Sequence, residues 1–390
     1  MKELVMGARI VGWGHTKFGR LEDNLEQLIV KAAKEAIDHA DVNPAEIDGI
    51  WMGHYNGGLV SDGFPSSLAL QIDPQLRFTP STRLENACAS GSAAIHGARN
   101  AINSGNAKIA LIIGVEKMTE KDTKGVTESL MTASYQAEES AVSFPQVFGR
   151  FADSYFQKYG NKSNILAKIA AKNHTNSVNN PLAQMQKDIG FDFCNTVSEK
   201  NPMVAPPLRL TDCSLVSDGA AAIVMVSEEL EGNFERGVKF RSAVQVNDFL
   251  PMSKREILKF EGPRKAFHDA YNEASIKVDD IDFAEVHDCF TIAELLVYEA
   301  MGITKLGQGE RAVLDGTVYS DGSLPVNLSG GLKAKGHPVG ATGVSMHALV
   351  SAQLTGSAGL MQKENANIGC IFNMGGSGVA NYCSILEASK

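Results

Sequence analysis

The chain lacks the features of membrane-spanning and secreted proteins. No apolar stretch approaches about 18 uninterrupted residues, and the first residues break their apolar run with Gly, Arg and His before a signal-peptide core could form. Only six cysteines occur among 390 residues, none of them in a CxxC pair, so neither a disulfide framework nor a zinc knuckle is predicted. We therefore expect a cytoplasmic protein whose thiols stay reduced and free.

Positive charge is also scarce. The formal net charge is −9 and no basic run exceeds two residues, so we expect no nucleic-acid surface, and any anionic ligand must meet local positive groups. Apolar residues, at 44%, and 37 glycines are plentiful, a composition typical of a globular α/β enzyme. The length suits two domains or halves of similar size better than one core.

Internal similarity indicates that the chain contains two copies of one unit. The matching pairs are 31–54 with 265–288, 91–105 with 342–356, and 107–114 with 366–373. The first pair aligns without gaps and reads as a helix, a turn and a strand; the later pairs read as a small-residue helix followed by a buried strand. The alternative is chance similarity between amphipathic helices. The common order of the pairs favours two α/β halves in tandem.

A polar, Asn-rich stretch at about 120–210 has no counterpart in the second half. It reads as an inserted, partly helical lid, after which the apolar strand at 221–230 completes the first half. The predicted units are a first half of 1–119 and 211–238, an insert of 120–210, and a second half of 239–390.

Cys88 lies where an extended segment meets small residues and then a helix. Such an elbow places a side chain at a helix N-terminus, where the positive end of the helix dipole is expected to lower a thiol pKa. The small neighbours would leave room for a bulky group on the sulfur. The alternative is an inert buried cysteine, the usual fate of a free thiol.

His337 lies in a glycine-rich loop that leads into the second copy of the small-residue helix. Gly336 and Pro338 restrict the backbone on either side, which suits an imidazole that must stay aimed at a reacting group. A Gly-His-Pro triplet alone is most often a turn. The symmetry of the two halves adds weight, because it predicts that the two helix N-termini face each other.

The segment His287-Asp288-Cys289-Phe290 follows an apolar strand, at the end where side chains emerge from a parallel sheet. It offers an imidazole, a carboxylate and a thiol together. Structural alternatives are a surface histidine, a core cysteine, and an Asp288 that caps the helix at 291–302.

The loop 373–378, NMGGSG, ends another apolar strand and leaves backbone N–H groups uncovered, as an oxyanion site requires. A phosphate site is the alternative, but neither GxGxxG nor the P-loop pattern is present in this loop.

Taken in order, NACASG (86–91), HDCF (287–290), GGLKAKGHPVGATG (330–343) and NMGGSG (373–378) resemble the motifs of the thiolase family, whose members join or split acyl-CoA thioesters at a β-keto bond. The sequence is similar to the sterol-carrier-protein and archaeal type. HDCF stands where common thiolases have Asn-Glu-Ala-Phe, and Asn373 stands where they have a second catalytic cysteine.

The resemblance implies a role for each motif. Cys88 would carry the acyl group, and His337 would activate it. Cys289 would act as the second acid and base in place of a cysteine at 373, while His287 and His337 would hydrogen-bond the enolate oxygen. The backbone N–H groups of Cys88 and Gly375 would form a second oxyanion hole.

The resemblance also implies the thiolase fold, an α/β fold with two tandem βαβαβαββ halves in five α/β/α/β/α layers and an inserted loop domain that binds coenzyme A. Ser329 and Gly330 are expected to contact the coenzyme, and Lys158, Lys162, Lys168 and Lys172 are candidates for its 3′-phosphate, although a solvated helix face is an alternative for most of the lysines. We expect acyl-CoA substrates, no permanent cofactor or metal, and a homodimer or homotetramer.

The expected activity is formation or cleavage of a short 3-ketoacyl-CoA, above all acetoacetyl-CoA, in lipid metabolism. One alternative is a retro-aldol lyase of the same fold that acts on β-hydroxyacyl-CoA; such relatives lack the nucleophilic cysteine. Another is a component of a complex with a hydroxymethylglutaryl-CoA synthase and a small OB-fold and zinc-ribbon protein that binds acyl-CoA. The acyl chain length is left open by the sequence.

Overall fold

The computed structural model describes residues 7–389, so residues 1–6 of the predicted first half and residue 390 of the second lie outside the described residues. The strands are β1 (Ala8–His15), β2 (Gly49–Gly53), β3 (Ser81–Leu84), β4 (Ile109–Glu116), β5 (Met203–Ala205), β6 (Leu208–Arg209), β7 (Gly219–Ser227), β8 (Val238–Asn247), β9 (Phe283–Val286), β10 (Ile368–Gly375) and β11 (Ala380–Ala388). The α-helices are α1 (Leu25–Ala40), α2 (Ser90–Asn103), α3 (Thr123–Met131), α4 (Gln136–Glu139), α5 (Phe144–Tyr159), α6 (Ser163–Ser177), α7 (Phe191–Asn195), α8 (Glu261–Ala274), α9 (Thr291–Met301), α10 (Glu310–Leu314), α11 (Gly331–Ala334) and α12 (Thr342–Leu354).

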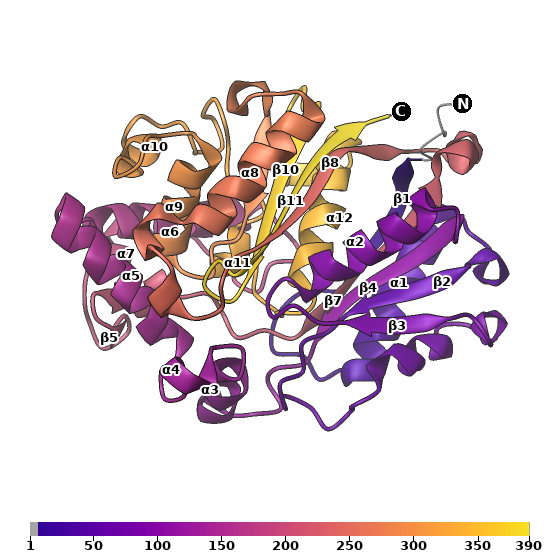
Figure 1. Ribbon diagram of the computed structural model, residues 1–390, viewed down its shortest axis with the longest axis horizontal. Coiled ribbons are helices and arrows are strands. Elements are labelled where there is room, and N and C mark those ends of the chain that lie inside the picture. Colours follow the sequence, from indigo (N-terminus) through magenta and orange to yellow (C-terminus); the bar gives the residue numbers. More distant parts are fainter. Residues whose placement is uncertain (1–6, 390) are drawn as a thin grey trace.

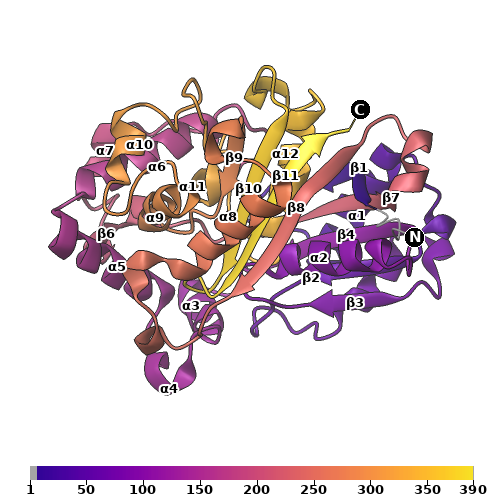
Figure 2. The same cartoon turned by 45° about the horizontal axis from the view of Figure 1, so that its top comes forward.

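The two halves meet in one continuous sheet of nine strands, in the order β3-β2-β4-β7-β1-β8-β11-β10-β9. The junction is a short antiparallel pairing of β1 with β8, in which Arg9 lies opposite Lys239. Outward from this junction both halves have the same order, because β1, β7, β4 and β2 correspond to β8, β11, β10 and β9. The repeated sequence segments thus occupy matching places (Figures 1 and 2).

Each half departs from the full βαβαβαββ pattern at one place. Between β2 and β3 the first half has 3₁₀ turns at Pro65–Gln71 and Pro74–Leu76 instead of an α-helix. In the second half the third strand is reduced to a single bridge between Ala284 and Val326. Pro325 precedes that bridge and has no N–H to extend the ladder.

Helices separate and cover the two parts of the sheet. Helix α1 packs on β1, β4 and β7; α2 and α12 lie between the two parts of the sheet, and α8 covers β8 and β11 on the far side (Figure 1). This is the predicted α/β/α/β/α order. The burial pattern explains it, since every residue of α12 is buried whereas α1 and α8 each bury only one face.

Glycines let α2 and α12 approach each other at their first turns. A Cβ atom on Gly343 would lie 2.4 Å from the backbone nitrogen of Ser92, and one on Gly91 would lie 2.8 Å from the carbonyl oxygen of Gly340. Neither distance is possible for a real side chain. The expectation that the two helix N-termini face each other is confirmed.

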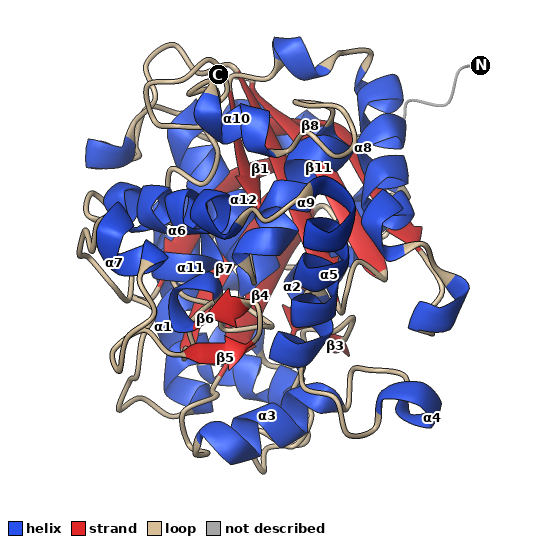
Figure 3. Ribbon diagram, turned by 90° about the vertical axis from the view of Figure 1, so that its left-hand side faces the viewer, coloured by secondary structure: helices blue, strands red, loops and turns tan. Residues whose placement is uncertain are grey.

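The segment between β4 and β7 carries α3 to α7 and the β5–β6 hairpin, and it packs mainly on the second half. Helices α5 and α6 contact α9, and the Phe148 ring stacks on Phe290 with centroids 4.6 Å apart. Figure 3 looks onto this side of the molecule. The limits of the insert, at 120 and 210, stay a prediction. Within residues 7–389, no helix is both long and apolar enough to cross a membrane.

Candidate active site

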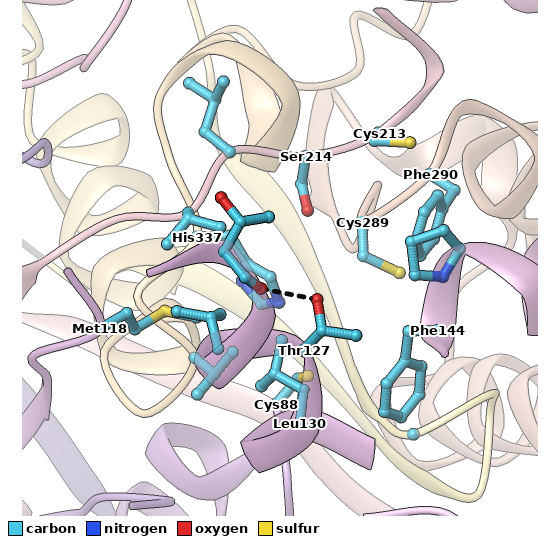
Figure 4. Close-up of a pocket in the computed structure, with 17 residues that line it drawn as sticks. Cys88, Met118, Thr127, Leu130, Phe144, Cys213, Ser214, Cys289, Phe290 and His337 are labelled. Carbon is cyan, nitrogen blue, oxygen red and sulfur yellow. Dashed lines mark hydrogen bonds between the residues drawn. The ribbon is translucent and has the colours of Figure 1, made fainter. Parts of the chain in front are cut away.

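A cavity of about 170 Å³ opens where the two halves meet helices α3 and α5. Its wall carries Cys88, Cys289 and His337, three of the residues predicted from the motifs (Figure 4). The rest is largely apolar and includes Met118, Val126, Leu130, Phe144, Pro145, Leu215, Val216, Phe290 and Val339. The Thr127 hydroxyl donates to the Thr123 carbonyl 2.8 Å away, so this side chain adds little polarity to the wall.

Cys88 lies on a tight elbow between the end of β3 and the start of α2. Ala87, directly before it, has a φ of 50°, a left-handed conformation that is costly for a residue with a Cβ atom. Ser90 holds the turn, because its Oγ donates to the Ala87 carbonyl at 2.6 Å and accepts from the Asn86 N–H at 2.9 Å. The predicted strand-to-helix elbow is confirmed, and it presents Cys88 to the cavity.

The expectation of a lowered thiol pKa is wrong for the free protein. Burial raises the pKa of Cys88 to about 12, although the N–H of Gly376 and its own N–H oppose this shift. Cys88 is therefore a neutral thiol at physiological pH, and a base must take its proton when it reacts.

His337 is held by hydrogen bonds at its backbone and at one ring nitrogen. Its N–H donates to Ser217 Oγ at 2.9 Å, and its Nδ1 lies 2.7 Å from Thr342 Oγ1. Burial, and then the Lys335 ammonium, lower the pKa of His337 to about 3, so the ring is neutral. Gly336 has a φ of 118°, which fits the predicted restriction of this loop.

His287 lies fully buried beside His337, with ring centroids 5.1 Å apart and planes at 87°. Burial, and then His337, lower its pKa well below the usual value. The sulfur of Cys88 and one ring nitrogen from each histidine lie within 4.8 Å of one another, a spacing that could hold a metal ion.

Cys289 lies on the cavity wall, and its segment pairs with the chain at 213–214. The Ser214 N–H donates to the Cys289 carbonyl at 2.9 Å, and Cys213 bridges to Phe290. Burial, followed by nearby Cys88 and Asp288, raises the pKa of Cys289 well above its usual value. It therefore holds its proton at neutral pH.

Asp288 has a structural role. It does not cap the helix at 291–302; its carboxylate accepts from the backbone N–H groups of Leu332 and Lys333, at 2.6 and 3.1 Å, and so caps α11. Burial raises the pKa of Asp288 to about 7. It positions the loop that leads to His337.

The glycine loop after β10 lies against the Cys88 elbow. A Cβ atom on Gly375 would lie 2.2 Å from the Asn86 carbonyl oxygen, so only glycine fits there. The N–H that hydrogen-bonds the Cys88 sulfur belongs to Gly376, which the sequence reasoning did not single out. Arg255 holds the next residue by donating to the Ser377 carbonyl at 2.8 Å.

The structure does not place Ser329 and Gly330 on the cavity. Ser329 is buried, with its backbone N–H donating to Glu285 Oε1 at 2.9 Å and its Oγ to Oε2 at 2.5 Å. Gly330 packs against Ser177, where a Cβ atom would lie 2.5 Å from the serine Cβ. A contact of these two residues with coenzyme A stays a prediction.

The four candidate lysines also lie away from the cavity wall. Lys172 is buried and paired with Glu294 at 2.8 Å, which excludes a role on a surface phosphate. Lys162 pairs with Glu310 at 2.7 Å, and Lys158 and Lys168 lie over aromatic rings. None of these contacts identifies a phosphate site.

Sequence reasoning missed several residues that hold the reactive groups, namely Ser92, Ser217, Thr342, Asn373 and Gly376. They come from separate elements. Thr342, Asn373 and Gly376 lie within the motifs described above, but no local pattern predicts which group each of the five residues contacts. The one available signal was the position of Asn373, at which a related motif carries a cysteine.

Alkylation of Cys88 by iodoacetamide is expected to accelerate steadily with pH. Because the Cys88 pKa is raised and His337 is neutral, the thiolate fraction should increase roughly tenfold per pH unit from about pH 6 to pH 10, without a plateau. The rate is measured by mass spectrometry of the Cys88 peptide, with Cys88→Ala as the blank. An alkylation rate that does not change with pH in this range would indicate a thiolate–imidazolium pair and contradict the expectation.

Family comparisons match almost the whole chain. The family model described as "Thiolase, N-terminal domain" matches residues 8–229, and "Thiolase C-terminal domain-like" matches residues 245–388. Acetyl-CoA acetyltransferase of Methanothermobacter thermautotrophicus is 38% identical over 95% of this chain and 96% of that protein. Human sterol carrier protein 2 is 33% identical over 94% of this chain and 69% of that protein.

Solved structures share the architecture. The chain resembles the "Ltp2-ChsH2(DUF35) aldolase" with a TM-score of 0.82, 21% identity and 98% coverage of both chains. It resembles human mitochondrial 3-ketoacyl-CoA thiolase in complex with CoA with a TM-score of 0.74, 19% identity and 99% coverage of both chains. At these identities the likeness concerns the fold.

Proposed function

Because the chain belongs to the thiolase family, whose family models match it in both halves, we propose that it forms or cleaves a short 3-ketoacyl-CoA, above all acetoacetyl-CoA, through an acyl-Cys88 intermediate. The observation that carries the proposal is the meeting of Cys88, Cys289 and His337 on one largely apolar cavity. Its relatives among the acetyl-CoA acetyltransferases, at 38% and 35% identity, support the choice of substrate.

In the cleavage direction, His337 Nε2 takes the Cys88 proton, and the sulfur attacks the keto carbon of the substrate. The carbon–carbon bond breaks, and its electron pair passes into the enolate of acetyl-CoA. Cys289, a neutral thiol with a raised pKa, gives its proton to the enolate carbon. Acetyl-Cys88 and a Cys289 thiolate remain.

Free coenzyme A completes the cycle. The Cys289 thiolate takes the proton of its thiol, and the coenzyme sulfur attacks the acetyl-Cys88 carbonyl. Acetyl-CoA leaves, and the Cys88 thiolate recovers its proton from the His337 imidazolium. Protons and electron pairs balance with two thiols and one imidazole.

Two groups of donors would bind the developing negative charges. His287, which is buried beside His337 behind the residues that line the cavity, would donate to the enolate oxygen together with protonated His337. The backbone N–H groups of Cys88 and of Gly375 or Gly376 face the oxygen of the tetrahedral intermediate at Cys88. Each such donor contributes on the order of 10²-fold or more in rate in well-studied enzymes.

The test is to incubate the protein with acetoacetyl-CoA and coenzyme A and to follow the loss of the β-ketothioester enolate absorbance. We expect stoichiometric formation of acetyl-CoA. No loss, with coenzyme binding confirmed by calorimetry, would contradict the proposal. A series of longer 3-ketoacyl-CoA substrates then defines the chain length that the cavity accepts.

The retro-aldol alternative has less support, because that reaction needs no nucleophile and this cavity presents Cys88. The fold likeness to an aldolase does not decide between the reactions. Release of an aldehyde or ketone from a β-hydroxyacyl-CoA without free coenzyme A would favour the lyase.

We also propose that the protein assembles with a second copy or with a small acyl-CoA-binding protein. Strand β3 supports the first assembly, since it is an edge of the sheet and Phe78 beside it is 84% exposed. Native mass measurement of the protein, alone and with the product of a neighbouring gene of zinc-ribbon type, distinguishes these assemblies from a monomer.

A further inference from the structure

Asn373, on β10, lies between the two reactive motifs and is fully buried. Its Oδ1 lies 2.8 Å from Ser92 Oγ. Its Nδ2 lies 3.2 Å from the carbonyl oxygen of Cys88 and 3.0 Å from Nδ1 of His287. One amide thus contacts the nucleophile's backbone, the neighbouring histidine and the first turn of α2.

These contacts determine which way the amide points. A carbonyl oxygen only accepts, so the Asn373 atom that faces the Cys88 carbonyl must be the NH₂ group. The Ser92 hydroxyl then donates to Oδ1, and the second N–H of the amide points at His287 Nδ1. That ring nitrogen must accept, so the neutral ring carries its proton on Nε2.

His337 has the opposite tautomer. The Thr342 hydroxyl, whose Oγ1 lies 2.7 Å from His337 Nδ1, donates to the Pro338 carbonyl at 3.1 Å. The hydroxyl therefore accepts from the ring, Nδ1 carries the proton, and Nε2 keeps a lone pair. His287 Nε2 is buried, and no hydrogen-bond partner for it occurs within the described part of the chain.

We propose that Asn373 is a positioning residue that holds His287 as an Nε2–H donor, opposite in tautomer to His337. The two rings beside the Cys88 sulfur are then a base and a donor at the same time. His337 accepts the thiol proton, and His287 offers a permanent hydrogen bond to the substrate oxygen. The tautomer stands on the contacts alone, whereas its catalytic use rests on the proposed function.

The same tautomer has a second consequence. The Cys88 sulfur and one ring nitrogen of each histidine have metal-ligand spacing, and a metal ion needs a lone pair from each ligand. With both Nδ1 atoms engaged, Nε2 is the nitrogen left to each ring. Asn373 keeps a proton on His287 Nε2, so this nitrogen has no lone pair to bind a metal ion, and only two of the three ligands remain. A residue that accepts from Nδ1–H would release that lone pair to Zn²⁺.

The experiment compares Asn, Ala and Asp at position 373 in the full chain. Asn373→Asp turns the donor into an acceptor, and Asn373→Ala leaves Nδ1 without a partner. We expect Zn²⁺ affinity, measured from protection of Cys88 against iodoacetamide, to rise in the order Asn, Ala, Asp, by about 10- to 100-fold overall. If the Zn²⁺ affinity depended only on the space left by a shorter side chain, Asn373→Ala would differ most from the natural protein.

Nitrogen-15 NMR of histidine-labelled protein reads the tautomer directly and needs no substrate. We expect His287 as Nε2–H in the natural protein and as Nδ1–H in Asn373→Asp, with the signals assigned through His287→Gln. Thr342→Val is the matched control: it removes the acceptor at His337 and should leave the His287 signal unchanged.

For the reaction, we expect Asn373→Asp to lower kcat of thiolysis by about 10² to 10³-fold with a small change in KM. An Nδ1–H signal for His287 in the natural protein, or equal Zn²⁺ affinity in all three forms, would overturn the proposal. Because neither readout involves turnover, both separate its failure from failure of the proposed thiolase reaction.

Discussion

Cys88→Ser is expected to lower thiolysis of acetoacetyl-CoA by on the order of 10⁵-fold and to abolish the acyl-enzyme. A serine hydroxyl is far less acidic than a thiol. The neutral His337, with its pKa lowered to about 3, is too weak a base to activate it. The elbow at Ala87 tolerates the change because the two side chains are of similar size. The acyl-enzyme is measured by intact mass after incubation with acetyl-CoA.

Cys194→Ala is the matched control for this prediction. Cys194 is a buried thiol in a separate small cluster with Ala167 and Ala170, and it does not line the cavity. We expect its removal to change the rate by less than about threefold. Retention of an acetyl adduct by Cys88→Ser, or its formation on another cysteine, would show that Cys88 is not the nucleophile.

Cys289→Ala is expected to separate the two half-reactions. Acetylation of Cys88 by acetyl-CoA uses Cys289 only to protonate the departing coenzyme thiolate. A thiolate is a stable leaving group that water can protonate, so we expect acetylation to continue within about tenfold of the natural rate. Cleavage of acetoacetyl-CoA needs a proton at the enolate carbon, and we expect it to fall by about 10² to 10⁴-fold. The thiol suits this role because burial raises its pKa, so it is protonated before each turnover.

Cys213→Ala tests whether cleavage requires the thiol at position 289 or any thiol on the cavity wall. Cys213 lines the same cavity and is half-buried, with a pKa raised to about 12, but its sulfur lies 3.5 Å from the Arg209 carbonyl oxygen. We expect a loss of less than about tenfold in both half-reactions. If Cys289→Ala and Cys213→Ala lost the same fraction of the cleavage rate, the proposal that Cys289 donates the proton would be contradicted.

Local patterns were enough to predict the architecture and three residues that meet on the cavity wall. The two halves could be predicted because each copy keeps its helix and strand periodicity, and α1 and α8 still bury matching alanines such as Ala36 and Ala270. Cys88 and His337 could be predicted because each lies within a motif of adjacent residues before one of the two central helices.

Local patterns could not predict Asn373 as a partner of His287, because the contact joins β10 to the loop after β9 and the first turn of α2. For the same reason, the sequence could not show that Ser329, which directly precedes the motif of His337, is buried against Glu285 and does not line the cavity. Adjacent residues in a loop can point in opposite directions, and only the packed chain decides which one meets the cavity.

By itself, the sequence determined the duplicated α/β fold and the family, and it predicted the nucleophile, since all three depend on the order of residues along the chain. The tertiary structure decided the protonation of Cys88 and the tautomers of His287 and His337. Burial and hydrogen-bond partners set these states, and both arise only when segments almost 300 residues apart, such as Cys88 and Asn373, come into contact.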